Sequence, residues 1–155
     1  MIPILDWAAA GEDRAAFAAA LGTALRETGF FLLINPQIPA DLRADFFRLS
    51  NAFFDLSRNE KAKFSILDTP HFRGWAKPGD ESLDETRPEV DTKETFNIGY
   101  DLRPEDPRVL ANESFRGVNR WPDIAGFKNV MLAYYNACQS QSLALLSVMA
   151  EDLGL

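Results

Sequence analysis

The sequence contains one cysteine and one histidine, and each scarcity excludes a class of protein. Cys138 cannot form an internal disulfide, which favours a reducing compartment. His71 alone cannot serve any mechanism that needs two imidazoles from this chain. No apolar run approaches the ~20 residues of a membrane-spanning helix, and the N-terminus lacks the features of a signal peptide. We therefore expect a cytoplasmic protein that makes no use of a membrane.

Positively charged residues are fewer than negatively charged ones. The chain has 16 Lys and Arg against 23 Asp and Glu, a formal net charge of −7, which disfavours nucleic acid and anionic membrane surfaces as partners. The acidic excess falls between residues 80 and 113. Carboxylates there, such as Asp84, Glu85 and Glu89, could pair for acid/base catalysis or bind calcium. They lack the ligand spacing of an EF-hand, so a solvated acidic loop is the favoured interpretation.

The chain has 155 residues, which fits one domain, and its 46% hydrophobic content is ordinary for a globular protein. Apolar spacing and turn residues predict a mainly helical α+β fold with two or three short strands. We expect strands over 2–7, 30–34 and 94–100. We expect helices from Asp13 to a stop at Gly29, over 39–54, after a Ser57–Glu60 capping box, and from an Asp123 cap to Gly154.

Motifs for nucleophilic, phosphate or zinc chemistry are missing. A nucleophilic triad would have to use His71, and Cys138 lies on a predicted apolar helix face where an inert thiol is usual. There is no Walker A sequence, no G-x-G-x-x-G and no Cys/His zinc spacing. Arg73-Gly74-Trp75 is the more interesting segment, since a guanidinium beside an indole could hold a carboxylate. The alternative is a surface arginine next to a buried tryptophan.

Seven short segments, taken in order, resemble the N-terminal region of the isopenicillin N synthase-like family of iron(II)- and 2-oxoglutarate-dependent oxygenases. Each is weak alone, but their order along the whole chain is specific. They are Ile2–Asp6 (family pattern IPxID), Thr28–Asn35 (GFFxxxNH), Phe54–Lys61 (FFxLPxEEK), Arg73–Trp75 (RGY), Asp91–Gly99 (DxKExFDIG), Asn119–Pro122 (NxWP) and Leu153–Leu155 (LGL).

The resemblance implies that residues 1–155 are the helical and strand region that flanks a double-stranded β-helix, or jelly-roll, barrel absent from this chain. In such enzymes this region braces the barrel and lends residues to the pocket of a small-molecule substrate. Arg73 and Trp75 match the segment that contributes residues to this pocket, and Phe96 on the predicted strand is a further substrate-binding candidate. No catalytic residue is expected in this chain.

The sequence departs from the family in lacking its metal signature. These enzymes hold iron(II) with a His-x-Asp…His triad and leave positions open for 2-oxoglutarate and oxygen. His71 is the single histidine, and Arg73 stands where the acid would be. We therefore expect no metal and no cofactor to be bound by this chain alone, and no activity from it. Iron(II) and 2-oxoglutarate are expected of the complete oxidoreductase.

Apolar surface predicts a partner. The shorter helices are too small to cover all of the apolar surface of the Phe30–Ile34 run and of the wide apolar face of the last helix. This surface is expected to be covered by the missing barrel, in cis or in trans, by a second copy of the chain, or by a rearranged strand. Two alternatives remain open: a stand-alone binding module that has lost its chemistry, and a metal-independent enzyme that uses the acidic loop.

Overall fold

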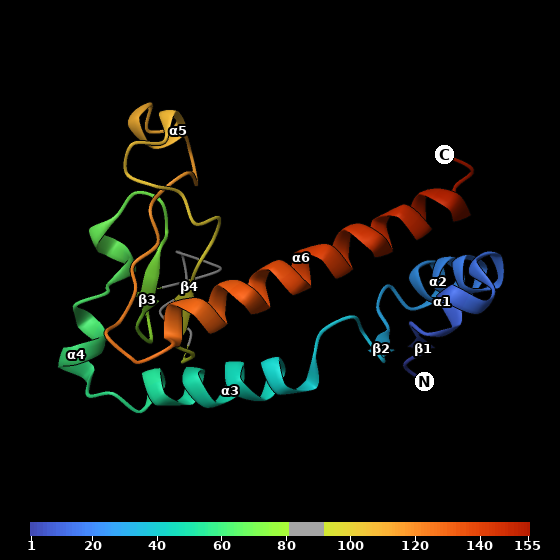
Figure 1. Ribbon diagram of the computed structural model, residues 1–155, viewed down its shortest axis with the longest axis horizontal. Coiled ribbons are helices and arrows are strands. Elements are labelled where there is room, and N and C mark those ends of the chain that lie inside the picture. The colour runs from blue at the N-terminus through green and yellow to red at the C-terminus, as the bar shows by residue number, and fades with distance from the viewer. Residues whose placement is uncertain (81–91) are drawn as a thin grey trace. The chain divides into compact units, whose positions relative to one another are not determined.

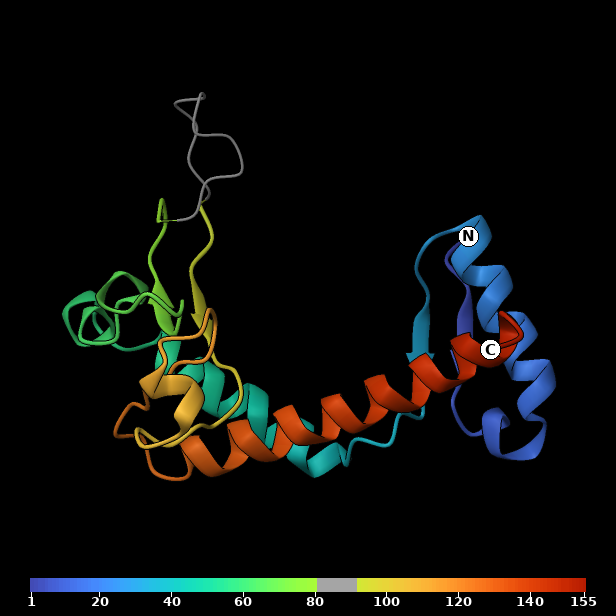
Figure 2. The same cartoon turned by 90° about the horizontal axis from the view of Figure 1, so that it is seen from above.

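The computed structural model describes residues 1–80 and 92–155, which divide into two compact units. Unit 1 comprises Met1–Phe46 and Val130–Leu155, and unit 2 comprises Phe47–Asn129. The described residues form a mainly helical α+β fold with four short strands and without a closed barrel (Figures 1 and 2). The predicted fold class is confirmed at this level, with one strand more than expected.

Unit 1 is built around a two-stranded parallel sheet. Strands β1 (Ile4–Asp6) and β2 (Leu32–Ile34) pair with Ile4 opposite Leu32. Helices α1 (Ala9–Glu12) and α2 (Arg14–Glu27) form the crossover between them. The helix predicted after Asp13 is α2, and the Asp13 carboxylate caps it by accepting from the Ala16 N–H at 3.0 Å.

The end of the long helix α6 (Phe127–Asp152) belongs to unit 1 and lies beside α2 (Figures 1 and 2). Arg14 donates to Glu151 at 2.7 Å, and Arg26 donates to Asp152 at 2.5 Å. Apolar side chains fill the space between these helices and the sheet. The buried core residues of unit 1 are Leu5, Trp7, Ala10, Phe17, Ala18, Leu21, Ala24 and Val148.

Unit 2 combines short helices with an antiparallel hairpin. Helix α3 (Ala40–Phe54) ends in it, and α4 (Arg58–Ala62), the 3-10 turn η1 (Ile66–Asp68) and α5 (Pro107–Leu110) lie within it. Ser57 and Glu60 form the predicted capping box at the start of α4. Strands β3 (Gly74–Ala76) and β4 (Thr95–Asn97) pair with Trp75 opposite Phe96.

Aromatic rings form the centre of unit 2. Phe53 and Phe127 are almost completely buried, with ring centroids 6.0 Å apart. Phe96 packs against both, at 4.4 Å from Phe53 and 5.7 Å from Phe127. These contacts fix β4 against the last turn of α3 and the first residues of α6.

Three expectations need correction or stay untested. Strand β3 forms where the sequence predicts an irregular segment. The last helix begins at Phe127 rather than after Asp123, because Gly126 has a left-handed backbone (φ 79°) that separates a turn from the helix. The carboxylates Asp84, Glu85 and Glu89 lie outside the described residues, so the acidic-loop interpretation is not tested.

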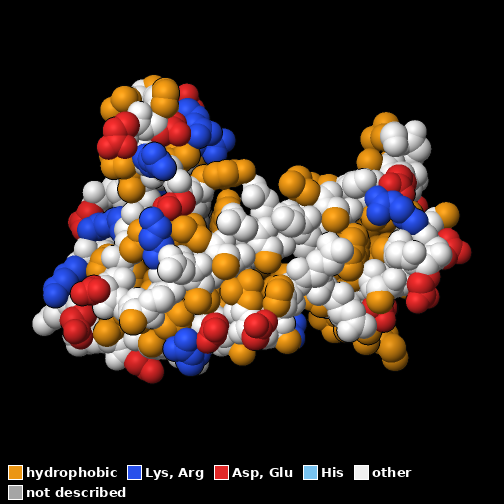
Figure 3. Space-filling view, in the orientation of Figure 1, with side chains coloured by type: hydrophobic (Ala, Val, Ile, Leu, Met, Phe, Trp, Pro, Cys, Tyr) orange, Lys and Arg blue, Asp and Glu red, His pale blue; other side chains and the backbone are white. Residues whose placement is uncertain are grey.

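One face of the β1–β2 sheet is apolar and exposed. Ile4 on β1 and Leu32 and Ile34 on β2 are each exposed, as is Phe30 just before β2. Figure 3 shows hydrophobic side chains at the surface in this part of unit 1. The exposed apolar surface predicted for residues 30–34 is therefore present. Among the described residues, no helix is both long enough and apolar enough to span a bilayer.

Candidate functional site on the β3–β4 hairpin

The hairpin of unit 2 carries the residues proposed from the sequence to bind substrate. Arg73 directly precedes β3, Trp75 is the central residue of β3, and Phe96 is its partner on β4. Antiparallel pairing therefore brings together residues that lie more than twenty positions apart. Trp75 is only 3% exposed, and Phe96 packs on the aromatic centre of the unit.

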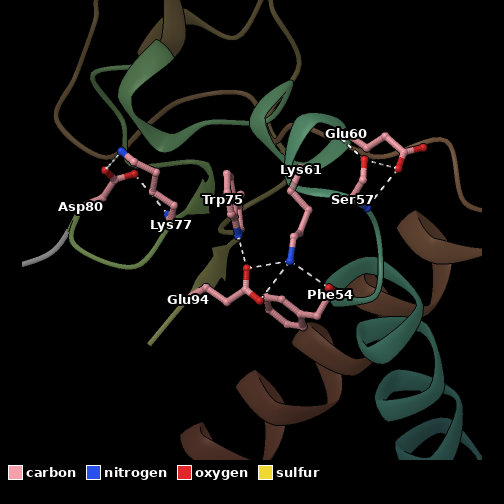
Figure 4. A network of polar contacts seen from close by, with 8 residues as sticks. All are labelled: Phe54, Ser57, Glu60, Lys61, Trp75, Lys77, Asp80 and Glu94. Atoms are coloured by element: carbon pink, nitrogen blue, oxygen red, sulfur yellow. Dashed lines mark hydrogen bonds and ion pairs between the residues drawn. The ribbon is translucent and has the colours of Figure 1, made fainter. Parts of the chain in front are cut away.

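A buried polar cluster holds the indole of Trp75 in place (Figure 4). The Trp75 Nε1–H donates to Glu94 Oε2 at 2.7 Å. Lys61 Nζ donates to both Glu94 oxygens, at 2.9 and 3.1 Å, and to the Phe54 carbonyl at 2.8 Å. All three ammonium donors are thus used, which a lysine with only 8% of its surface exposed requires.

The cluster ties three parts of unit 2 together. Lys61 comes from α4, Trp75 from β3 and Glu94 from the residue before β4. The ammonium also lies 5.6 Å from the centre of the Trp75 ring, within cation–π range. Neither Lys61 nor Glu94 was singled out from the sequence. Their signal lay in the family patterns, because Lys61 is the last letter of the FFxLPxEEK match and Glu94 is the glutamate of the DxKExFDIG match.

A cleft of about 390 Å³ opens beside this cluster. Its lining residues are Arg58, Lys61, Trp75, Pro78 and Glu94. The lining carries two cations and one carboxylate, and the carboxylate is already matched by Lys61. The charge that the cleft presents to solvent is therefore that of Arg58, which is exposed at the first position of α4.

The Arg73 guanidinium bridges two loops. Its Nη1 donates to the His71 carbonyl at 3.0 Å, and its Nη2 donates to the Phe115 carbonyl at 2.7 Å. It also packs closely on Gly99, where an added Cβ would clash with the guanidinium. Arg73 therefore fixes the loop before β3 to the loop before Asn119, and any side chain at position 99 would displace its guanidinium.

Asn119 performs a similar role after β4. Its Nδ2 donates to the Gly99 carbonyl at 2.9 Å, and its Oδ1 accepts from the Gly99 N–H at 2.9 Å. Burial raises the pKa of nearby Asp101, but hydrogen bonds from Lys128, Asn119 and Trp121 outweigh that effect and lower it. Asn119, the first residue of the Asn119–Pro122 motif, thus holds the backbone of Gly99, which follows β4, in place.

Residues able to ligate a metal do not gather in the described part of the chain. Within 1–80 and 92–155, no group of three or more His, Cys, Asp or Glu side chains is arranged to hold a metal ion. His71 is packed against Gly117, whose added Cβ would lie 2.5 Å from the ring. The described residues therefore do not themselves fit a three-ligand ferrous centre.

Comparisons with known proteins point to one family. Residues 2–124 match the family described as the N-terminal region of the non-haem dioxygenase in morphine synthesis. A 2-oxoglutarate-dependent dioxygenase of Gibberella zeae is 32% identical over 98% of this chain and 40% of its own length. Validamycin A dioxygenase of Streptomyces hygroscopicus subsp. limoneus is 30% identical over 99% of this chain and 44% of its own length.

Solved structures agree. A full-length Neurospora crassa protein, in complex with alpha-KG, is 28% identical with a TM-score of 0.79 and aligns over 99% of this chain and 47% of its own. A 2OG-Fe(II) oxygenase family protein of Caulobacter crescentus shares the fold at a TM-score of 0.81 and 23% identity. The chain spans less than half the length of these relatives. It belongs to the non-haem, 2-oxoglutarate-dependent dioxygenase family, and it corresponds to the N-terminal region of those enzymes.

Proposed function

We propose that residues 1–155 are the N-terminal region of an iron(II)/2-oxoglutarate-dependent oxidoreductase acting on a small molecule. In this proposal the catalytic jelly-roll barrel lies outside the chain, and the chain braces it and shapes part of its substrate pocket. The observation that carries the proposal is the extent of the match. Nearly the whole chain aligns with 2-oxoglutarate-dependent dioxygenases, while only about two fifths of each relative is accounted for.

The exposed sheet of unit 1 supports the bracing role. Parallel strands are normally covered on both faces, whereas Ile4, Leu32 and Ile34 leave apolar side chains on an open face. A two-stranded sheet also leaves an unpaired edge on each strand. An additional sheet that packed here would remove both features. A stand-alone binding module has no need to expose them, so they favour the oxygenase-region interpretation.

The hairpin of unit 2 supports the role in the substrate pocket. Trp75 and Phe96 are packed inside the unit, so we assign them as positioning residues that fix the hairpin from beneath. Arg73 ties the hairpin to the loop of Phe115 and is the member of the three that lies at the end of a strand. We propose that its guanidinium borders the pocket in the complete enzyme.

Iron(II) and 2-oxoglutarate would supply the oxidising chemistry in that enzyme. The described residues of this chain do not fit the metal, so the ligands have to come from outside them. The chain contributes the positions of the hairpin, held by a partly buried ion pair, and of the loops that Arg73 holds.

The proposal is tested by extending the chain with the coding sequence that follows it. With Fe(II), the extended protein should convert 2-oxoglutarate to succinate, and the 155-residue chain should not. Turnover by the 155-residue chain alone would overturn the proposal.

Two lysine substitutions then separate a pocket role for Arg73 from a structural one. Arg120 is the matched control, because its guanidinium also bridges backbone carbonyls, those of Lys63 and Ser65, at 2.7 Å. Arg73→Lys should raise KM for the substrate well beyond any change caused by Arg120→Lys. Equal effects of both substitutions on KM would reduce Arg73 to a structural residue.

A further inference from the structure

Two phenylalanines of unit 2 adopt a backbone conformation that their side chains disfavour. Phe72 has φ 55° and Phe115 has φ 61°, both in the left-handed region. Bulky residues rarely adopt this conformation, because it brings the side chain too close to the backbone. Such strain persists where the surrounding structure enforces it, and here Arg73 does so by holding the carbonyls of His71 and Phe115.

The strained backbones place both rings at the surface. Phe72 is 56% exposed and Phe115 is 61% exposed, and the rings stack with centroids 5.9 Å apart and planes inclined by 27°. The two rings come from loops more than forty residues apart, which Arg73 and the packing of His71 on Gly117 hold together. An enforced, strained and solvent-exposed aromatic pair indicates a contact surface.

The size of the pair limits what can cover it. A fully buried Phe side chain removes about 150–250 Å² from water, so the two rings, exposed by 56% and 61%, together present about 175–290 Å² to solvent. An independent protein partner needs about 800 Å² on each side. A small ligand is normally enclosed by a concave pocket, and two rings more than half exposed give it one wall. A segment that is covalently joined to the chain needs neither a large interface nor an enclosing pocket, because the covalent link gives it a high effective concentration at the pair.

We infer that the Phe72–Phe115 pair is a docking surface for polypeptide that follows this chain in the complete protein. The inference rests on the proposed function, since more than half the length of each curated relative lies beyond the matched region. The docked segment presents an apolar side chain or aromatic ring to the pair. Arg73 is the positioning residue for both rings.

Hydroxyl-radical footprinting tests this on the 155-residue chain and on the chain extended by its downstream coding sequence. Without added substrate, oxidation of Phe72 and Phe115 should fall at least fivefold in the extended protein. Leu110, an exposed apolar residue of the same unit, is the internal reference. Unchanged oxidation of both rings in the extended protein would overturn the inference. So would protection that appears only when substrate is added, or protection in the short chain that grows with its concentration.

A double substitution gives a second readout. Asn tolerates the left-handed backbone, so Phe72→Asn with Phe115→Asn keeps the loops while removing the rings. It should lower the Tm of the extended protein by several degrees more than that of the 155-residue chain. Equal shifts would contradict docking. Succinate formation by the extended wild-type protein tests the proposed function separately. An inactive protein with protected rings would contradict the proposed function but not docking, and an active protein with exposed rings would contradict docking but not the proposed function.

Discussion

Glu94→Gln tests whether the Lys61–Glu94–Trp75 cluster holds the hairpin. The substitution keeps the shape of the side chain but leaves the ammonium of Lys61, a residue that is 8% exposed, without a countercharge. Breaking a buried ion pair from one side costs about 3–5 kcal/mol. Because the Glu94 side chain is 29% exposed, we expect the lower end, about 3 kcal/mol. For a domain of this size that corresponds to a Tm lower by about 6–12 °C.

Urea denaturation followed by circular dichroism measures the change in the free energy of unfolding. Asp68→Asn is the matched control, since it breaks the Arg120–Asp68 pair of the same unit at a carboxylate that is 56% exposed, and it should cost about 0–1 kcal/mol. Lys61→Met combined with Glu94→Gln removes both charges and should be less destabilising than Glu94→Gln alone. A Glu94→Gln cost no larger than the control would refute the buried-cluster reasoning.

Three further changes probe the rest of unit 2. Gly74→Ala should lower the free energy of unfolding by about 2–4 kcal/mol in urea denaturation. Gly74 has φ 115°, and an added Cβ would clash with the Phe64 carbonyl oxygen. A neutral effect would show that the backbone at the start of β3 is not constrained. Asn119→Ala should cost about 2–3 kcal/mol, since it strands the N–H and carbonyl of Gly99, and a cost under about 0.5 kcal/mol would contradict that. Hydrogen bonding from Arg108 lowers the pKa of Asp106 from 3.8 to about 2. The ionised Asp106 carboxylate therefore stabilises the fold above pH 3.8, and this contribution is lost as the pH falls through about 2. In thermal melts at a series of pH values, the stability difference between wild type and Asp106→Asn should shrink over that window. A constant difference would refute the assignment.

Features set by neighbouring residues were predictable from the sequence. The Ser57–Glu60 capping box and the Gly29 helix stop depend on contacts within a few residues, and both are present. The helix over Ala40–Phe54 was predictable because its apolar side chains repeat at helical spacing. Asp123 was a plausible cap, but the left-handed Gly126 delays the helix to Phe127.

Features set by distant residues were not predictable. Strand β3 has three residues, all buried, so it shows no alternation, and it exists because β4 pairs with it, with Trp75 opposite Phe96. Lys61 and Glu94 are thirty-three positions apart, and neither has a local pattern that marks it as buried. The exposed Phe72–Phe115 pair depends on two left-handed residues that carry no glycine signal.

The most direct test of the account is anaerobic titration of Fe(II) into the 155-residue chain and into the chain extended by its downstream coding sequence, with 2-oxoglutarate present. We expect one tightly bound ferrous ion per extended protein, with the visible metal-to-ligand charge-transfer band of the ternary complex, and no stoichiometric binding by the short chain. One tightly bound ferrous ion in the short chain, with the same band, would contradict it.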